Sequence, residues 1–201
     1  MKALKQTSGF CIVLSAPSGT GKTTIARALL EADTTIERSI SMTTRARRSN
    51  EIDGEDYIFT TEPKFRSMIE KGEFLEWAEV HSDLYGTSRA SVETIIGDGR
   101  IALMVIDVQG GQSIKAVFPD AVFVFLMPPS IESLAKRLRK RGTEDESAIR
   151  SRLAQAEIEI RYSSKYTYGV VNEDGKKQQA VDQIHAIIAA ERCRINRWEA
   201  S

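Results

Sequence analysis

The sequence predicts an α/β protein whose parallel sheet is flanked by helices. Short apolar runs rich in β-branched residues, typical of strands buried on both faces, alternate with segments whose apolar residues recur at helical spacing. The clearest runs are FCIVLSA (10–16), IALMVIDV (101–108) and AVFVFLM (121–127). Because neighbouring parallel strands need crossover connections, this alternation indicates helices between the strands of one sheet.

The first half of the chain supplies the first strand and several shorter elements. A helix over GKTTIARALLEA (21–32) follows the first strand, since Ile25 and Leu29 recur at helical spacing. The other elements expected here are short strands and loops over 39–60, a helix begun by Pro63 and stopped near Gly72, and a turn and helix over 85–97 that end at Gly97.

The second half is expected to be mostly helical outside its strands. A capping box in TEDE, with Thr143 as the cap and Glu146 at the third helical position, predicts the start of a new helix. The remaining elements are a short helix over 110–118, an amphipathic helix over 129–142, a helix through 149–160, a strand and turn over 170–175, and a C-terminal helix over 178–195.

Length and composition exclude several classes of protein. The chain of 201 residues suits one sizeable core with small lobes, and 28 basic against 28 acidic residues give zero net charge, which argues against a general nucleic-acid binder. Cys11 lies in an apolar run and is expected in the core, so no disulfide framework is indicated. No signal peptide or membrane span is visible, and we expect a cytoplasmic protein with no membrane partner.

The stretch SAPSGTGKTT (15–24) predicts a phosphate-binding loop. Glycines expose backbone N–H groups, the following helix N-terminus adds partial positive charge, Lys22 can reach β- and γ-phosphates, and Thr23 can hold Mg²⁺. The pattern is GxxxxGK[ST] with Ala16 in place of the first glycine. An ordinary glycine-rich turn is the alternative, and the strand before and helix after the loop favour phosphate binding.

Asp107 comes at the end of the buried run IALMVID (101–107). Phosphate-loop proteins place the second acid of the metal site at such a position, on a strand beside the loop. Asp also commonly begins loops, which is the alternative interpretation. The phosphate loop upstream favours the functional one.

Several further motifs carry a family resemblance. They are SMTTRARR (41–48), DGEDYIF (53–59), EFLEWAEVHSDLYGTS (73–88), VIDVQG (105–110), MPPS (127–130) and RGTEDE (141–146), and with them the chain resembles guanylate kinases over nearly its whole length. The resemblance implies a P-loop NTPase core (1–38, 98–130 and 165–201), a small GMP-binding lobe (about 39–97) and a helical lid (about 131–164), all in a single domain.

The resemblance also implies a reaction and the residues that serve it. Mg²⁺-dependent phosphoryl transfer from ATP to GMP or dGMP would use Lys22, Arg45, Arg137, Arg141 and Arg152 as catalytic residues. The implied ATP site comprises Ala16, Pro17, Ser18, Gly19, Thr20, Gly21, Lys22, Thr23, Thr24 and Asn172, and the implied Mg²⁺ site comprises Thr23 and Asp107.

The implied GMP site combines phosphate-binding and base-binding residues. Guanine presents N1–H and N2–H donors that one carboxylate can accept together, and a hydroxyl can donate to O6. Glu76 matches the family's guanine-binding carboxylate, and Thr87 stands where the family often has serine. The full implied set is Ser41, Arg45, Arg48, Tyr57, Glu76, Tyr85, Gly86, Thr87 and Asp107.

Other interpretations also fit the basic segments and the function as a whole. The cluster TTRARR (43–48) also fits a solvated basic loop or a nucleic-acid patch, and the lid arginines also fit an exposed helix face. Rival functions are a guanylate-kinase-like interaction module, which would lack the phosphate loop, and a kinase for another acceptor such as a phosphorylated sugar. His81 and His185 are expected at the surface or in packing. Neither the oligomeric state nor a role for RCRINRW (192–198) is predicted.

Overall fold

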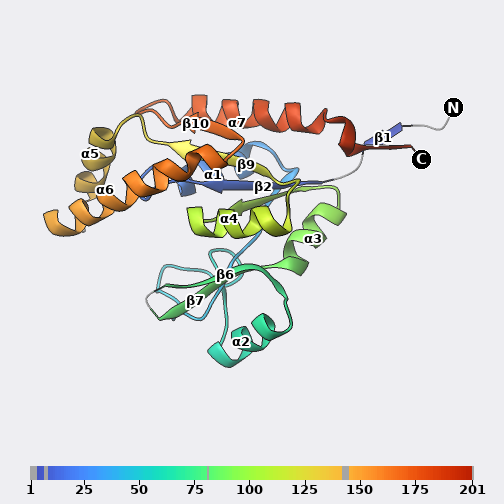
Figure 1. The fold of residues 1–201 in the computed structure, drawn as a ribbon, viewed down its shortest axis with the longest axis horizontal. Helices are drawn as coiled ribbons and strands as arrows, with labels where there is room; N and C mark the ends of the chain where they lie inside the picture. The colour runs from blue at the N-terminus through green and yellow to red at the C-terminus, as the bar shows by residue number, and fades with distance from the viewer. Residues whose placement is uncertain (1–3, 7–8, 81, 142–144, 201) are drawn as a thin grey trace.

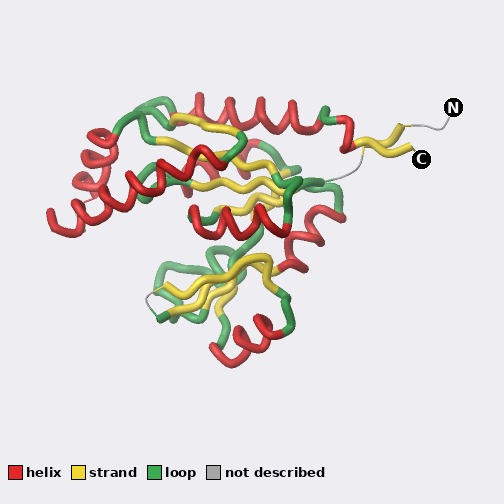
Figure 2. Tube along the Cα trace, viewed as in Figure 1, coloured by secondary structure: helices red, strands yellow, loops and turns green. Residues whose placement is uncertain are grey.

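The computed structural model describes residues 4–6, 9–80, 82–141 and 145–200, and its centre is a parallel sheet. The strands run in the order β10-β9-β2-β8-β3, and every neighbouring pair is parallel. Their bounds are β2 Cys11–Ser15, β3 Ile36–Arg38, β8 Ile101–Val105, β9 Val122–Met127 and β10 Tyr168–Val171. The predicted fold class is confirmed. Strand β2, the first strand expected from the sequence, lies at the centre of the sheet (Figures 1 and 2).

Helices cover both faces of this sheet. Alternate residues of β2 serve the two sides: Ile12 and Leu14 pack with α1 (Lys22–Ala32) and α7 (Lys177–Arg192). Cys11 and Val13 pack with α3 (Arg89–Gly97) and α4 (Val108–Val117) on the other face (Figure 1). Cys11 is therefore a core residue as predicted, and burial raises the pKa of its thiol to about 12.

A second, mixed sheet forms a lobe below the main sheet in Figure 1. Its order is β5-β4-β7-β6, with Phe65 of the lobe helix stacked on Phe74 at 4.3 Å between ring centroids. The bounds are β4 Met42–Thr43, β5 Ile58–Phe59, α2 Glu62–Glu70, β6 Phe74–Val80 and β7 Asp83–Ser88.

The turn expected over the start of 85–97 is wrong, because Tyr85 to Ser88 lie in strand β7. This strand pairs antiparallel with both β4 and β6, and Gly86 is one of the residues paired on each side. Two flanking strands thus override the local turn preference of Tyr-Gly. The helix that follows ends at Gly97, as expected.

The sequence range given to the lobe, 39–97, also contains helix α3. Val92 and Ile95 of this helix are buried against Met104 of the main sheet, in the same cluster as Val13. Helix α3 therefore packs on the main sheet and not in the Phe65–Phe74 cluster of the lobe.

Two helices, α5 (Ile131–Arg141) and α6 (Glu146–Arg161), and the short 3-10 helix η1 (Tyr162–Lys165) occupy the segment that is expected to be a lid. The capping prediction is wrong: Asp145 caps α6 by accepting a hydrogen bond from the Ala148 backbone at 2.8 Å, and Glu146 is the first helical residue. Thr143 lies outside the described residues. Glu146 instead receives the Arg139 guanidinium of α5 at 2.8 Å, so it joins the two helices.

The arginine-rich C-terminal segment fastens the end of the chain to the core. Beyond α7, Arg197 in the 3-10 helix η2 (Ile195–Arg197) lies over the Phe10 ring at 4.1 Å and pairs with the buried Glu191 at 3.3 Å. Strand β11 (Trp198–Ala200) then pairs antiparallel with β1 (Leu4–Gln6), which brings the two ends of the chain together (Figure 1). None of the described helices is long and apolar enough to cross a bilayer.

Candidate active site

The phosphate loop joins β2 to α1, and its glycines are required by the backbone. Gly19 and Gly21 have φ angles of 87° and 97°, a region that side chains disfavour. A Cβ atom at Gly21 would also lie 2.7 Å from the Asn172 side-chain nitrogen. That Asn172 nitrogen donates to the Thr20 carbonyl at 2.7 Å, which fixes the loop from the neighbouring end of β10.

Lys22 is the first residue of α1, and its ammonium group lies inside the site. Nζ donates to the Ile106 carbonyl at 2.6 Å, which aims the side chain across the sheet edge toward β8. Burial lowers the pKa of Lys22 to about 8, and the nearby carboxylates of Asp107 and Glu159 act in the opposite direction. The ammonium is therefore held in a desolvated place, where its attraction for an anion is strong.

Asp107 caps a helix and also lines a cavity. Its Oδ1 atom accepts a hydrogen bond from the Gly110 backbone at 2.8 Å, so it is the N-cap of α4. It also lines the cavity over the phosphate loop. The structural and functional interpretations of this residue are thus compatible.

Two cavities meet at Lys22 and Asp107. The first, about 320 Å³, lies over the phosphate loop and is lined by Ala16, Pro17, Ser18, Gly19, Gly21, Lys22, Thr23, Thr24, Asp107 and Glu159. The second, about 330 Å³, opens toward the lobe and is lined by Lys22, Ser41, Tyr57, Glu76, Ala78, Val80, Tyr85, Gly86, Val105, Ile106 and Asp107. Molecules bound in the two cavities would therefore face each other across the same ammonium and carboxylate.

A third cavity of about 350 Å³ lies behind the loop, between Thr20, Arg137 and Asn172. Arg137 does not line the phosphate cavity here. Its guanidinium donates to the Thr20 carbonyl at 3.0 Å and to the Asn172 carbonyl at 2.6 Å, and it pairs with Asp174 at 2.8 Å. It therefore braces the loop and the β10 end against each other.

Glu76 projects from β6 into the second cavity, and its carboxylate is largely removed from water. Burial raises its pKa, Asp107 adds to this, and a hydrogen bond from Thr87 opposes it. The Thr87 hydroxyl donates to Oε1 at 2.6 Å. Thr87 is itself 1% exposed and does not line the cavity as the structure has it, and its hydroxyl orients Glu76.

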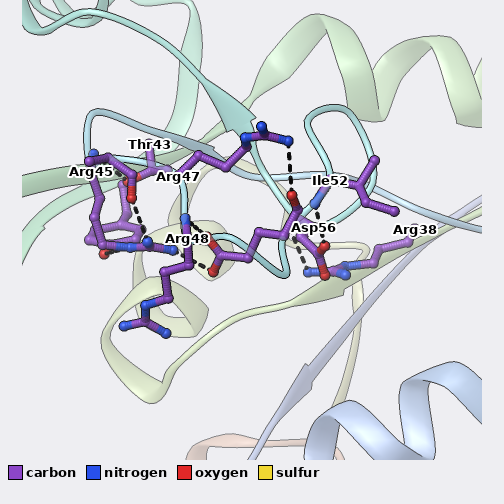
Figure 3. A network of polar contacts seen from close by, with 10 residues as sticks. Arg38, Thr43, Arg45, Arg47, Arg48, Ile52 and Asp56 are labelled. Carbon is purple, nitrogen blue, oxygen red and sulfur yellow. Dashed lines mark hydrogen bonds and ion pairs between the residues drawn. The ribbon is translucent and has the colours of Figure 1, made fainter.

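Arg45 belongs to a polar network in the lobe (Figure 3). Its guanidinium pairs with Glu51 at 2.7 Å, donates to the Tyr85 hydroxyl at 3.2 Å, and lies 5.6 Å from the Tyr57 ring centroid. Glu51 also accepts a hydrogen bond from the Arg48 backbone N–H at 2.9 Å, so one carboxylate joins the Arg45 side chain to the backbone of the loop. Because Tyr85 lines the second cavity, Arg45 lies directly behind its wall.

Most of the expected residues line one of the three cavities described above; among the described side chains, those of Arg45, Arg48, Thr87 and Arg152 do not. The Arg48 side chain is exposed, and Figure 3 shows its guanidinium outside the dashed contacts. Arg152 of α6 donates to the Ser18 hydroxyl at 3.2 Å, at the rim of the phosphate loop. Arg141 ends α5, and its side chain lies outside the described part of the molecule. His185 is on α7 and lines none of the cavities described above, while His81 lies outside the described residues.

Two carboxylates at the site were missed from the sequence. Glu51 and Glu159 each belong to a segment with several other acids or arginines, so nothing in the sequence alone separates them from surface residues. A signal for Glu159 was its spacing of seven residues from Arg152, which places the two side chains on one face of a helix. Glu51 had no comparable signal.

Together, a phosphate loop on a central parallel strand and a facing cavity built by a small lobe define a P-loop phosphotransferase with two ligand sites. Residues 8–191 match the family model described as guanylate kinase. The chain belongs to the guanylate kinase family and is a nucleoside monophosphate kinase.

Individual relatives support this membership. The chain is 46% identical to the guanylate kinase of Caldanaerobacter subterraneus subsp. tengcongensis, over 94% of this chain and 91% of that one. It is 44% identical to a guanylate kinase of Clostridium perfringens, over 98% and 90% of the two chains. The crystal structure of guanylate kinase from Anaplasma phagocytophilum is 34% identical, with a TM-score of 0.76 over 97% of this chain and 92% of that one.

Glu51 is predicted to position Arg45 for the acceptor. Glu51→Gln places an amide donor where the carboxylate now accepts from both Arg45 and the Arg48 backbone, so one of these bonds is lost. We expect kcat/KM for the acceptor nucleotide to fall roughly 10- to 100-fold, because misplacing a binding group is costly. Steady-state kinetics would measure this, with Glu55→Gln, an exposed acid in the same loop, as control. Tighter acceptor binding in Glu51→Gln would contradict the positioning role.

Proposed function

We propose that this protein transfers the γ-phosphoryl group of ATP to GMP or dGMP, giving ADP and GDP or dGDP. The observation that carries the proposal is the meeting of two cavities at Lys22 and Asp107, one over a phosphate loop and the other around Glu76. A donor phosphate in the first cavity and an acceptor phosphate in the second would approach each other beside the Lys22 ammonium. The reaction belongs to purine nucleotide metabolism, and we place it in the cytoplasm.

The loop from Ala16 to Thr24 binds the ATP phosphates through backbone N–H groups and the N-terminus of α1. Adenine occupies the third cavity beside Asn172, behind the loop. The oxygens of Thr23 and Asp107 border the phosphate cavity, and oxygen ligands are those that Mg²⁺ prefers. These two residues would hold the metal, directly or through water, and Mg²⁺ there would neutralise charge on the phosphates.

Guanine binds against Glu76. Its N1–H and N2–H groups donate to the carboxylate that Thr87 orients, and the Ser41 hydroxyl lines the same cavity within reach of O6. Adenine has no such pair of donors and would leave the buried carboxylate unpartnered. This chemistry favours GMP over AMP and over a phosphorylated sugar.

The acceptor phosphate binds toward Arg45, with the hydroxyls of Tyr57 and Tyr85 lining the approach and Arg48 joining as the lobe closes. The attacking phosphate oxygen is already ionised near neutral pH, so the transfer needs no general base. The protein supplies alignment and positive charge instead, which are the main demands of phosphoryl transfer.

The lid completes the donor site. Arg152 already reaches the rim of the phosphate loop at Ser18, and Arg137 holds the loop carbonyl of Thr20. We propose that lid closure brings Arg137, Arg141 and Arg152 toward the ATP phosphates, where they stabilise the transferring group and exclude water.

A coupled ADP-release assay tests the proposal. The protein with ATP and Mg²⁺ is offered GMP, dGMP, AMP, CMP, UMP and a sugar phosphate in turn. Turnover with GMP and dGMP, at kcat/KM at least about 10³-fold above AMP, is expected from the unpartnered carboxylate. Equal or faster turnover with AMP or with the sugar phosphate would contradict the assignment, and no turnover with any acceptor would favour a binding module.

A further inference from the structure

Glu159 is a carboxylate at the phosphate cavity for which the proposed reaction has no use. It lies on α6, half-buried, and lines the cavity together with Lys22, Thr23 and Asp107. Arg152, seven residues earlier on the same helix face, touches the Ser18 hydroxyl at 3.2 Å. One face of α6 therefore presents a cation and an anion to the phosphate loop.

Charged and polar groups around the phosphate loop act on the Glu159 carboxylate. Burial raises the pKa of its carboxyl, and so does Asp107, whereas Gln155, Lys22 and the Ser18 backbone act to lower it. The Gln155 side chain donates to Oε1 at 3.3 Å. In return, Glu159 and Asp107 both act to raise the pKa of Lys22. Two carboxylates and one ammonium thus share a single cavity.

This arrangement is unfavourable for a bare triphosphate. Free ATP brings about four negative charges to a cavity that already contains two carboxylates, and the repulsion is weakly screened where water is excluded. A divalent cation on the phosphates halves that charge and is attracted to the same carboxylates. Asp107 is needed as the cap of α4, but Glu159 has only Gln155 as a side-chain partner among the hydrogen bonds of the described residues.

We infer that Glu159 is a specificity residue that makes the phosphate site select the metal complex of a nucleoside triphosphate over the metal-free anion. The inference rests on the proposed ATP site and does not involve the acceptor. Helix α6 would then contribute two groups to the site. Arg152 binds the phosphates, and Glu159 interacts favourably with them only when they carry a metal ion. A structural role, through the contacts with Gln155 and the Ser18 backbone, would not distinguish the two forms of the nucleotide.

Calorimetric titration of the Glu159→Gln protein with ATP, once in excess Mg²⁺ and once in EDTA, tests this. We expect Glu159→Gln to bind metal-free ATP about tenfold more tightly than wild type and Mg·ATP no more tightly. The preference for Mg·ATP, taken as the ratio of the two dissociation constants, therefore falls about tenfold. Glu157→Gln is the matched control, since Glu157 is exposed on the same helix and lines none of the three cavities described above.

The outcomes separate the inference from the proposed function. An unchanged ratio in Glu159→Gln, with GMP phosphorylation intact in wild type, overturns the inference alone. Weaker binding of both forms would assign Glu159 to loop structure and also overturn it. A wild-type protein that binds ATP in neither condition contradicts the proposed function and the inference together. Glu159→Ala, which cannot hydrogen-bond to Gln155, should give the same loss of preference, and melting curves confirm that each variant is folded.

Discussion

Lys22→Met is expected to lower kcat on the order of 10³-fold while leaving the protein folded. Lys22 is the one residue whose cationic group borders both the donor and the acceptor cavity among the described residues. Removing a preorganised donor from the transition state of a desolvated site costs about 10²- to 10³-fold, and here a full charge is lost as well. Initial-rate assays with saturating ATP and GMP measure the effect on kcat.

The fold of Lys22→Met should survive because methionine suits the site. Burial lowers the pKa of Lys22, which means that the folded protein holds the ammonium at a free-energy cost when no nucleotide is bound. The apolar side chain avoids that cost, so Tm should not fall. Lys71→Met, an exposed position at the end of α2, is the control for a lost lysine charge. Retention of more than a tenth of wild-type kcat by Lys22→Met would contradict the assigned role.

The same lysine predicts a pH dependence. With a pKa of about 8 in the nucleotide-free protein, Lys22 is cationic below that pH and loses its charge above it. Affinity for ATP, and kcat/KM for ATP, should therefore decline as the pH rises through about 8. In the complex, phosphate charge raises the pKa, so kcat should stay level to higher pH. A flat affinity between pH 7 and 9.5 would contradict the buried location of the ammonium.

Glu76→Gln is expected to weaken GMP binding about 10²- to 10³-fold with little effect on ATP. The amide can accept only one of the two guanine donors and presents a donor of its own, and losing one partner of a buried charged hydrogen-bond pair is costly. Calorimetry with GMP and with ATP separates the two sites. Glu79→Gln, on the exposed side of the same strand, is the control.

Glu76→Gln should also melt at a higher temperature than wild type without ligand at neutral pH. The folded-state pKa of Glu76 is raised, mainly by burial, so the folded protein is penalised once the pH exceeds the ordinary pKa of a carboxyl group. The penalty is complete above the folded-state pKa and disappears below the unfolded one. The gain in Tm should thus vanish in acid. A lower Tm at neutral pH, or unchanged GMP affinity, would show that Glu76 is not a desolvated binding carboxylate.

The role of a residue could be predicted where it depends on the adjacent sequence. It could not be predicted where it depends on contacts with residues far away in the chain. The loop glycines and Lys22 are predictable because strand, loop and helix are consecutive, and Asp107 because it ends a buried apolar run. Glu51 was missed because its importance comes from the geometry of Arg45 and Tyr85, the latter 40 residues from Arg45. The hydrogen bond from Thr87 to Glu76 likewise depends on the pairing of β6 with β7, which the sequence does not show.

By itself, the sequence determined the layered α/β architecture, the phosphate loop and the family, because these follow from hydrophobic periodicity and from motifs contiguous in the chain. Only the tertiary structure decided that Tyr85 to Ser88 form a strand, that α3 packs on the main sheet, and that Lys22 and Asp107 border two cavities at once. The physical reason is that strand pairing, burial and shared cavities join segments far apart in sequence, and local preferences hold no information about which segments those are.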